Sequence, residues 1–97
     1  MRAFKFLPPA LEEMAEAAEY YEGCAPGLGG EFLAEIRSAV DQVLKRPGSW
    51  AQVRPGVRRY YTLRFPFAVI YAHDKATVTV LAVMHLRKKP DYWQDRL

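Results

Sequence analysis

The residues "FAVIYAHDKATVTVLAVMH", positions 67–85, predict a pair of β-strands at the centre of the fold. The first part, "FAVIYA", is apolar on both faces, as a central strand is, and the last part, "TVTVLAVMH", is rich in β-branched residues. The "HDKA" between them predicts a short hairpin turn. Just upstream, "VRRYYTLR" (residues 57–64) alternates with a period of two and predicts another strand. Three consecutive strands joined by short turns are expected to pair as an antiparallel meander.

One shorter strand and two helices are predicted before the meander. "RAFKFL" (residues 2–7) is rich in aromatic residues and predicts the strand, which Pro8 and Pro9 end. The next segment carries an apolar stripe at helical spacing, formed by Leu11, Met14, Ala15, Ala18 and Tyr21. The glycine-rich "GCAPGLGG" (residues 23–30) predicts a tight turn. A second helical stripe follows it and ends before Pro47, formed by Phe32, Leu33, Ile36, Val40, Val43 and Leu44.

This order, β-α-α-β-β-β, predicts a single α+β domain of two layers over residues 1–97. Both helices are expected to pack on one face of an antiparallel sheet. Residues 47–56 are expected to form a loop, and a short helical turn is expected after Pro90. The other face of the sheet is then left to solvent or to a partner.

The period of two in a strand predicts which side chains lie on that open face. On the strand at residues 57–64, the more polar set is Arg58, Tyr60, Thr62 and Arg64. On the last strand, we expect the two threonines, Thr77 and Thr79, to mark the open face, which places His85 on it as well. The open face is therefore predicted to be basic.

A basic and aromatic cluster, "VMHLRKKPDYW" (residues 83–93), follows the last strand. A histidine suits proton transfer near neutral pH, so His85 is a candidate general acid or base, or else a strand-end residue bonded to backbone. Tyr92 and Trp93 are either packing residues that hold a C-terminal tail or stacking platforms for bases. The cations that are candidates for binding phosphates or an acidic peptide are Arg58, Arg59, Arg64, Arg87, Lys88 and Lys89.

The charge of the chain is unevenly distributed. Its net charge is +3, but residues 1–53 carry five Lys/Arg against eight Asp/Glu, and residues 54–97 carry nine against three. The second part therefore has a net charge of +6, which favours an anionic partner. The acidic residues between positions 12 and 22 are interpreted as the solvated face of the first helix.

Several classes of protein are not supported. No apolar run has the length of about 18 residues that a membrane helix needs, and the first residues do not resemble a signal peptide. The single cysteine, Cys24, cannot form an internal disulfide, so a cytoplasmic location is expected. No metal-ligand spacing and no phosphate-binding glycine loop is present, and we expect neither a metal nor another cofactor.

The chain as a whole resembles the RelE/ParE superfamily of bacterial toxins, the toxin halves of type II toxin–antitoxin modules. The resemblance covers nearly all 97 residues. It rests on "EAAEYYEGCAPGLGGEFLAEI" (residues 16–36), "PGVRRYYTLRFPFAVIY" (residues 55–71) and "VLAVMHLRKKPDYWQDRL" (residues 80–97). It implies the fold inferred above, two helices on an antiparallel sheet, and it implies a cognate antitoxin as partner.

The superfamily has two branches with different targets. RelE-like members cut messenger RNA in the ribosome, and ParE-like members poison DNA gyrase without demonstrated nuclease chemistry. Where RelE-like enzymes have a phosphate-binding cation on the strand that matches "FAVIYA", this chain has Ala68, and only Arg54 matches the charged residues expected before the preceding strand. His85 and Tyr92 fall where some nucleolytic relatives keep a proton donor or acceptor.

The pattern "PGLGGEFL … FPFAVIY … PDYW" resembles the ParE-like and plasmid-stabilisation group more closely. We therefore expect a growth-inhibiting toxin that acts on gyrase and is neutralised by an antitoxin whose contacting segment is acidic. Contact with operator DNA is expected only through the antitoxin, and no membrane contact is expected. Two alternatives remain: a ribosome-dependent mRNA endoribonuclease, with His85 and Tyr92 as catalytic residues, and a harmless RNA-binding or structural domain. An exposed apolar strip beside the basic face is expected as part of the antitoxin interface.

Overall fold

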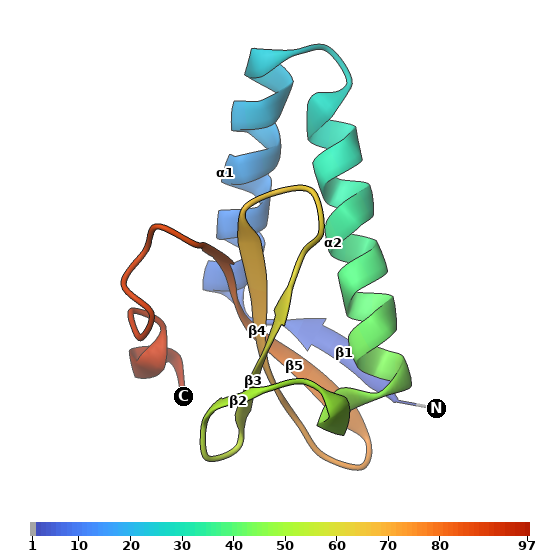
Figure 1. The fold of residues 1–97 in the computed structure, drawn as a ribbon, viewed down its shortest axis with the longest axis vertical. Helices are drawn as coiled ribbons and strands as arrows, with labels where there is room; N and C mark the ends of the chain where they lie inside the picture. Colours follow the sequence, from blue (N-terminus) through green and yellow to red (C-terminus); the bar gives the residue numbers. More distant parts are fainter. Residues whose placement is uncertain (1) are drawn as a thin grey trace.

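The structure, a computed structural model, describes residues 2–97 and contains the predicted meander of three strands (Figure 1). The meander consists of β3 (Val57–Tyr61), β4 (Phe67–His73) and β5 (Thr77–His85), and each strand pairs antiparallel with the next. Asp74 closes the β4–β5 turn, because one of its carboxylate oxygens accepts hydrogen bonds from the backbone N–H groups of Ala76 and Thr77. The expected turn in "HDKA" is thus confirmed.

The sheet is mixed rather than purely antiparallel. Its strand order is β1-β5-β4-β3-β2, and β1 (Ala3–Phe6) pairs parallel with β5 at one edge. The short strand β2 (Gln52–Arg54) forms the other edge, within the segment predicted to be a loop. A sequence pattern of period two gives the face of a side chain and not the direction of its strand, so the parallel pairing of β1 was not predicted.

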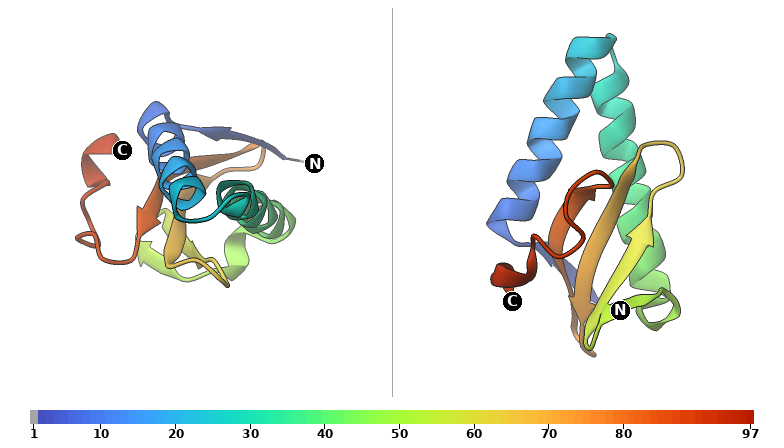
Figure 2. Two further views of the ribbon diagram at one scale, coloured as in Figure 1. Left: turned by 90° about the horizontal axis from the view of Figure 1, so that it is seen from above. Right: turned by 60° about the vertical axis from the view of Figure 1, so that its left-hand side comes forward.

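Helices α1 (Pro8–Cys24) and α2 (Leu28–Lys45) lie on the same side of the sheet, as predicted (Figures 1 and 2). The main core lies between the two layers, where Phe32, Ile36 and Val40 of α2 pack with Phe67 and other side chains of the central strands. Two single 3₁₀ turns complete the chain, η1 (Pro47–Ser49) and η2 (Gln94–Arg96). Within residues 2–97, no helix has the length and apolar character needed to span a bilayer.

The glycine-rich turn lets the two helices approach each other closely. A Cβ atom on Gly29 would lie 2.4 Å from the backbone oxygen of Ala18, so the contact requires glycine. Gly27 has a φ of 87°, a conformation that other residues rarely adopt. The Glu22 carboxylate accepts hydrogen bonds from the backbone N–H groups of Gly27 and Gly29, and so satisfies donors at the start of α2.

The sheet face opposite the helices, here called the far face, is not open as predicted. The C-terminal segment, residues 86–97, folds back beside the sheet (Figure 1). Trp93 is only 2% exposed, and it packs in a cluster with Ala68, Ile70 and Met84 of the far face. Its indole N–H donates to the Pro90 carbonyl at 2.7 Å. Trp93 therefore holds the tail on the sheet, which was one of the two alternatives considered for it.

A bulge in β5 reverses the predicted orientation of His85. Ala82 pairs with Ile70 and Val80 pairs with Tyr71, which leaves Leu81 as an extra residue on β5. Val80 and Val83 consequently both contribute to the core under the helices. His85, two residues after Val83, lies on this helix side. The threonines of β5 lie on the opposite side, so they do not mark the face of His85.

The polar set on β3 was also assigned to the wrong face. Arg58 pairs with Tyr71, which packs against Val43 of α2, so Arg58 points to the helix side. Tyr60 packs there as well. The far face of β3 instead carries Arg59, whose guanidinium lies 4.6 Å from the Tyr61 ring centroid.

Candidate functional site

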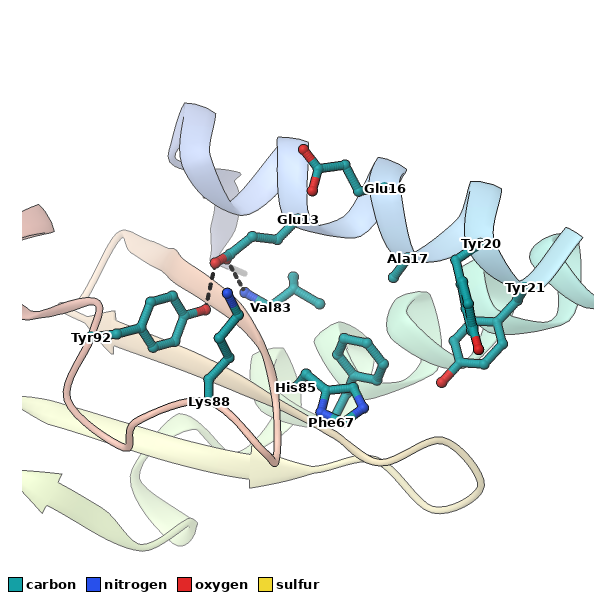
Figure 3. Close-up of a pocket in the computed structure, with 10 residues that line it drawn as sticks. All are labelled: Glu13, Glu16, Ala17, Tyr20, Tyr21, Phe67, Val83, His85, Lys88 and Tyr92. Atoms are coloured by element: carbon teal, nitrogen blue, oxygen red, sulfur yellow. Dashed lines mark hydrogen bonds between the residues drawn. The ribbon is translucent and has the colours of Figure 1, made fainter. Parts of the chain in front are cut away.

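A groove beside the end of β5 brings together both predicted proton-transfer residues, His85 and Tyr92 (Figure 3). The groove has a volume of about 370 Å³ and lies between α1 and the loop that follows β5. Lys88 contributes a cation to it. The other lining side chains are Glu13, Glu16, Ala17, Tyr20, Tyr21, Phe67 and Val83. We call it the His85 groove.

The imidazole of His85 is fixed by two contacts. Its ring meets the Phe67 ring edge to face at 5.0 Å between centroids, and its Nδ1 accepts a hydrogen bond of 3.0 Å from the backbone N–H of Arg87. In the neutral ring the proton is then on Nε2. This arrangement matches the second interpretation of His85, a strand-end residue bonded to backbone. In this tautomer the ring offers an N–H hydrogen-bond donor at Nε2, while its one lone pair, on Nδ1, is already engaged by the backbone.

The hydroxyl of Tyr92 is hydrogen-bonded to Glu13. It donates to that carboxylate, which also accepts hydrogen bonds from the backbone N–H of Val83 at 3.1 Å and from the guanidinium of Arg96 at 2.9 and 3.0 Å. Burial, and then the hydrogen bond to Glu13, raises the pKa of Tyr92 above its ordinary value. Tyr92 thus holds the C-terminal segment, and loss of its proton is disfavoured.

Glu13 and Arg96 hydrogen-bond to the part of the β5 edge that β1 does not pair with. β1 pairs with β5 only as far as Val80, so the next edge groups of β5 need other partners. The Val83 N–H donates to Glu13, and the Leu81 carbonyl accepts from Arg96 at 3.1 Å. The sequence gives no sign of this cluster around Glu13, because its members are far apart in the chain.

The predicted arginines do not surround His85. Arg58 donates a hydrogen bond to the Trp50 carbonyl at 2.7 Å. It lies opposite Tyr71 of β4, whereas His85 lies opposite Phe67, four residues earlier on the same strand. Arg64 forms an ion pair with Glu31 of α2. Of the predicted cations, Arg87, Lys88 and Lys89 are exposed on the C-terminal segment.

A second hollow, of about 580 Å³, lies on the far face and contains Arg54 and Arg59. Arg54 donates to the side-chain oxygen of Gln94 at 3.1 Å. Trp93 and Ile70 are among its apolar walls. Ala68 is fully buried on this face, between Tyr61 and Met84 of the neighbouring strands, and it offers no charge. Within residues 2–97, no three His, Cys, Asp or Glu side chains gather in a way that could hold a metal ion.

Comparison with known proteins identifies the family. The family model described as the ParE toxin of the type II toxin–antitoxin system, parDE, matches residues 4–90. The chain belongs to the ParE toxin family. This ParE-family chain is accordingly a type II toxin, the partner of an antitoxin, and its place in the RelE/ParE superfamily is confirmed.

A solved structure has the same fold as this ParE-family chain. It is described as the chromosomal ParDE TA system from P. aeruginosa, and it superposes with a TM-score of 0.77 at 18% sequence identity. The superposition covers 90% of this chain and 98% of that one. A search of curated protein sequences finds no match.

Proposed function

We propose that this ParE-family toxin arrests bacterial growth by poisoning DNA gyrase, without catalysis of its own, and that a cognate antitoxin neutralises it. The observation that carries the proposal is the match to the ParE toxin family over residues 4–90. The geometry of the candidate catalytic residues gives independent support.

Cleavage of RNA through a cyclic phosphate needs a base, an acid and cations over the phosphate. In the His85 groove, Nδ1 of His85 accepts a hydrogen bond from the backbone N–H of Arg87, and the hydroxyl of Tyr92 donates one to Glu13. Arg58 and Arg64 are bonded elsewhere, and the strand position that carries a phosphate-binding cation in RelE-like enzymes is the buried Ala68. The loss of one transition-state contact commonly costs on the order of a hundredfold in rate. This geometry favours docking over catalysis.

The docking surface that we assign to the target is the exposed start of the C-terminal segment. Arg87, Lys88 and Lys89 are exposed there. The segment is held in place by Trp93 and by the cluster around Glu13, so its cations are presented at small entropic cost. Because Trp93 is buried, it positions this surface and does not itself contact the target as an aromatic anchor.

Ribosome-dependent RNA cleavage is the second candidate. One observation favours it: His85, Tyr92 and Lys88 line the same groove. A substrate that displaced Tyr92 from Glu13 would find a hydroxyl, an imidazole and an ammonium group together. On this account His85 and Tyr92 are catalytic, and Arg87 supplies further charge.

The antitoxin segment that contacts the toxin is expected to be acidic, because residues 54–97 have a net charge of +6. Such segments commonly fold as they bind. Charge attraction should speed their association, and added salt should slow it.

Expression in a bacterial host tests the proposal. Induction of the wild-type chain alone should arrest growth, and expression of the small protein encoded by the neighbouring gene should restore it. Equal colony counts with and without induction, at verified protein levels, would favour the harmless RNA-binding or structural domain instead.

A further inference from the structure

One leucine is almost fully exposed on the loop between β3 and β4, residues 62–66. Leu63 is 93% exposed, the largest exposed fraction among the large apolar side chains of residues 2–97. The loop extends beside α2 (Figure 2). A single exposed apolar side chain is ordinary on a protein surface, so the surroundings of Leu63 decide whether it has a function.

Glu35 of α2 fixes this loop in place. One of its carboxylate oxygens accepts hydrogen bonds from the backbone N–H groups of Arg64 and Phe65, at 2.7 and 3.1 Å. The Arg64 guanidinium forms an ion pair with Glu31, and Phe65 is 7% exposed and packs in the main core. Leu63 is therefore held in one position before a partner binds, which lowers the entropic cost of docking.

The strand that leads into the loop has an open edge. β2 lies beside β3 only as far as Arg59, whose N–H donates to the Ala51 carbonyl at 3.0 Å. The Thr62 N–H donates to the Phe67 carbonyl of β4, so in the alternating antiparallel pattern the N–H and C=O of Tyr61 point away from β4. Within residues 2–97, no strand lies on that side of Tyr61. An extended segment of another protein can pair with such an edge.

A small hollow beside this edge has room for one apolar side chain. Its volume is about 80 Å³, and it lies between α2 and β3. Its walls are formed by Glu35, Ser38, Ala39, Tyr60, Thr62 and Leu63. A polypeptide supplies both the donor and the acceptor that a strand edge needs, and it can place a side chain in the hollow, whereas a phosphate backbone offers acceptors only. The occupant that fits these features is therefore a protein.

The charge of the region favours an acidic segment. Residues 57–73 carry three arginines and no Asp or Glu, and the nearby carboxylates of α2, Glu31 and Glu35, are bonded to the loop itself. The Leu86 N–H donates to the Pro66 carbonyl at 2.9 Å, so the loop adjoins the start of the exposed cations at residues 87–89. A second copy of this chain would bring these cations toward their own equivalents, because a two-fold interface places the same patch on both subunits.

We propose that residues 61–63, here called the β3 edge site, form the apolar part of the surface that docks on the target. The site receives an extended, acidic segment of the target protein, which pairs with the backbone of Tyr61 and packs an apolar side chain against Leu63. This inference rests on the function proposed above, which assigns the cations of residues 87–89 to the same target. The cations attract the segment, and the strand edge fixes its position.

Leu63→Asp tests the site. The change removes the apolar contact and sets a carboxylate against an acidic segment, so the concentration of purified chain that inhibits DNA gyrase on supercoiled DNA should rise more than about tenfold. Growth arrest should weaken in parallel. The matched control is Leu33→Asp, at a leucine that is 41% exposed on α2 and lies outside the site; it should inhibit like wild type. Circular dichroism checks that both variants are folded.

Tyr61→Pro tests the strand edge separately. Proline removes the outward N–H, and it is tolerated on an edge strand whose N–H faces solvent. Tyr61→Ala removes the same ring but keeps the N–H. Tyr61→Pro should therefore need a concentration roughly three- to tenfold higher than Tyr61→Ala needs for the same inhibition, as for the loss of one hydrogen bond. Equal inhibition by the two variants would overturn the pairing with the edge.

The remaining outcomes separate the site from the proposed function. Inhibition by Leu63→Asp equal to wild type, or an equal loss in Leu33→Asp, would overturn the site. If the wild-type chain arrests growth without inhibiting gyrase, the proposed target is wrong, and loss of arrest confined to Leu63→Asp would still support the site. A wild-type dimer in sedimentation that Leu63→Asp dissociates would overturn the occupant in favour of a second copy. If the wild-type chain neither arrests growth nor inhibits gyrase, both proposals fail.

Discussion

The Glu13 carboxylate in α1 binds the Arg96 guanidinium, 83 positions later in the chain, through hydrogen bonds of 2.9 and 3.0 Å. Both side chains are about four-fifths buried. The same carboxylate accepts from Tyr92 and from the Val83 N–H, so one side chain joins the first helix, the edge of β5 and the tail. We therefore expect the position of the C-terminal segment to depend on Glu13.

Glu13→Gln tests this dependence. The change removes the charge that Arg96 needs, and the free energy of unfolding should fall by about 1–3 kcal/mol, as for the loss of hydrogen bonds to a charged group. Thermal unfolding measures the loss. Glu16→Gln is the matched control, because Glu16 lies nearly one turn along the same helix, lines the same groove and is exposed; it should change stability by less than about 0.5 kcal/mol. Equal effects of both changes would contradict the role of Glu13.

Two neighbouring glycines in the helical hairpin, Gly29 and Gly30, allow a second comparison of a variant with its matched control. Gly29→Ala places a Cβ against the Ala18 carbonyl oxygen and should destabilise the fold by about 1–3 kcal/mol. Gly30→Ala, one residue later, meets no atom within 4 Å and should stabilise α2 by up to about 1 kcal/mol. Chemical denaturation of both variants measures the difference, and the account of the helix contact fails if Gly29→Ala is neutral.

Alkaline pH should weaken the fold through Tyr71. Burial raises the pKa of Tyr71 to about 12, and its hydroxyl donates to the Pro47 carbonyl at 2.6 Å. Above pH 10 the unfolded chain loses this proton while the folded chain keeps it, so the stabilisation is complete below about pH 10 and is lost as the pH rises toward 12. A shift of about two units corresponds to roughly 2–3 kcal/mol.

Tyr71→Phe should therefore give a shallower decline of stability between pH 10 and 12. Tyr92, whose pKa is also raised, should still contribute in the same direction. The exposed Tyr20 provides the control for a tyrosine-to-phenylalanine change outside the core, made as Tyr20→Phe. An unchanged slope in Tyr71→Phe would show that this hydroxyl does not titrate with unfolding.

Toxicity variants distinguish docking from catalysis. On the docking account, His85→Ala should retain growth arrest, while reversal of the charges at Arg87, Lys88 and Lys89 should reduce it strongly. Both changes affect side chains that are not in the core, so the fold should persist, which circular dichroism can check. Trp93→Ala does not serve this purpose, because truncation of a buried tryptophan costs about 3–5 kcal/mol and would unfold the tail in either case. Loss of toxicity confined to His85→Ala would indicate a nuclease.

The pattern of apolar residues predicted the order of elements and the packing of both helices on one face. It could not predict the parallel pairing of β1 or the bulge at Leu81, because both depend on contacts between segments far apart in the chain. The bulge has the larger consequence. One extra residue moves His85 from the expected open face to the groove beside α1, since every side chain after a one-residue shift changes face.

The candidate site was predicted as a set of residue types and not as an arrangement. His85, Tyr92 and Lys88 do meet in one groove, whereas Arg58 and Arg64 are engaged with Trp50 and Glu31. Glu13 was interpreted only as part of a solvated acidic helix face. No local signal separates it from Glu16, because its partners Tyr92 and Arg96 reach it only after the tail has folded back.

Purified toxin distinguishes the two candidate targets in two parallel reactions, one with DNA gyrase and supercoiled DNA and one with translating ribosomes and messenger RNA. We expect the toxin to inhibit gyrase and to trap cleaved DNA, the antitoxin to reverse this effect, and the messenger RNA to stay intact. Ribosome-dependent cleavage of the messenger RNA, with gyrase unaffected, would contradict this expectation.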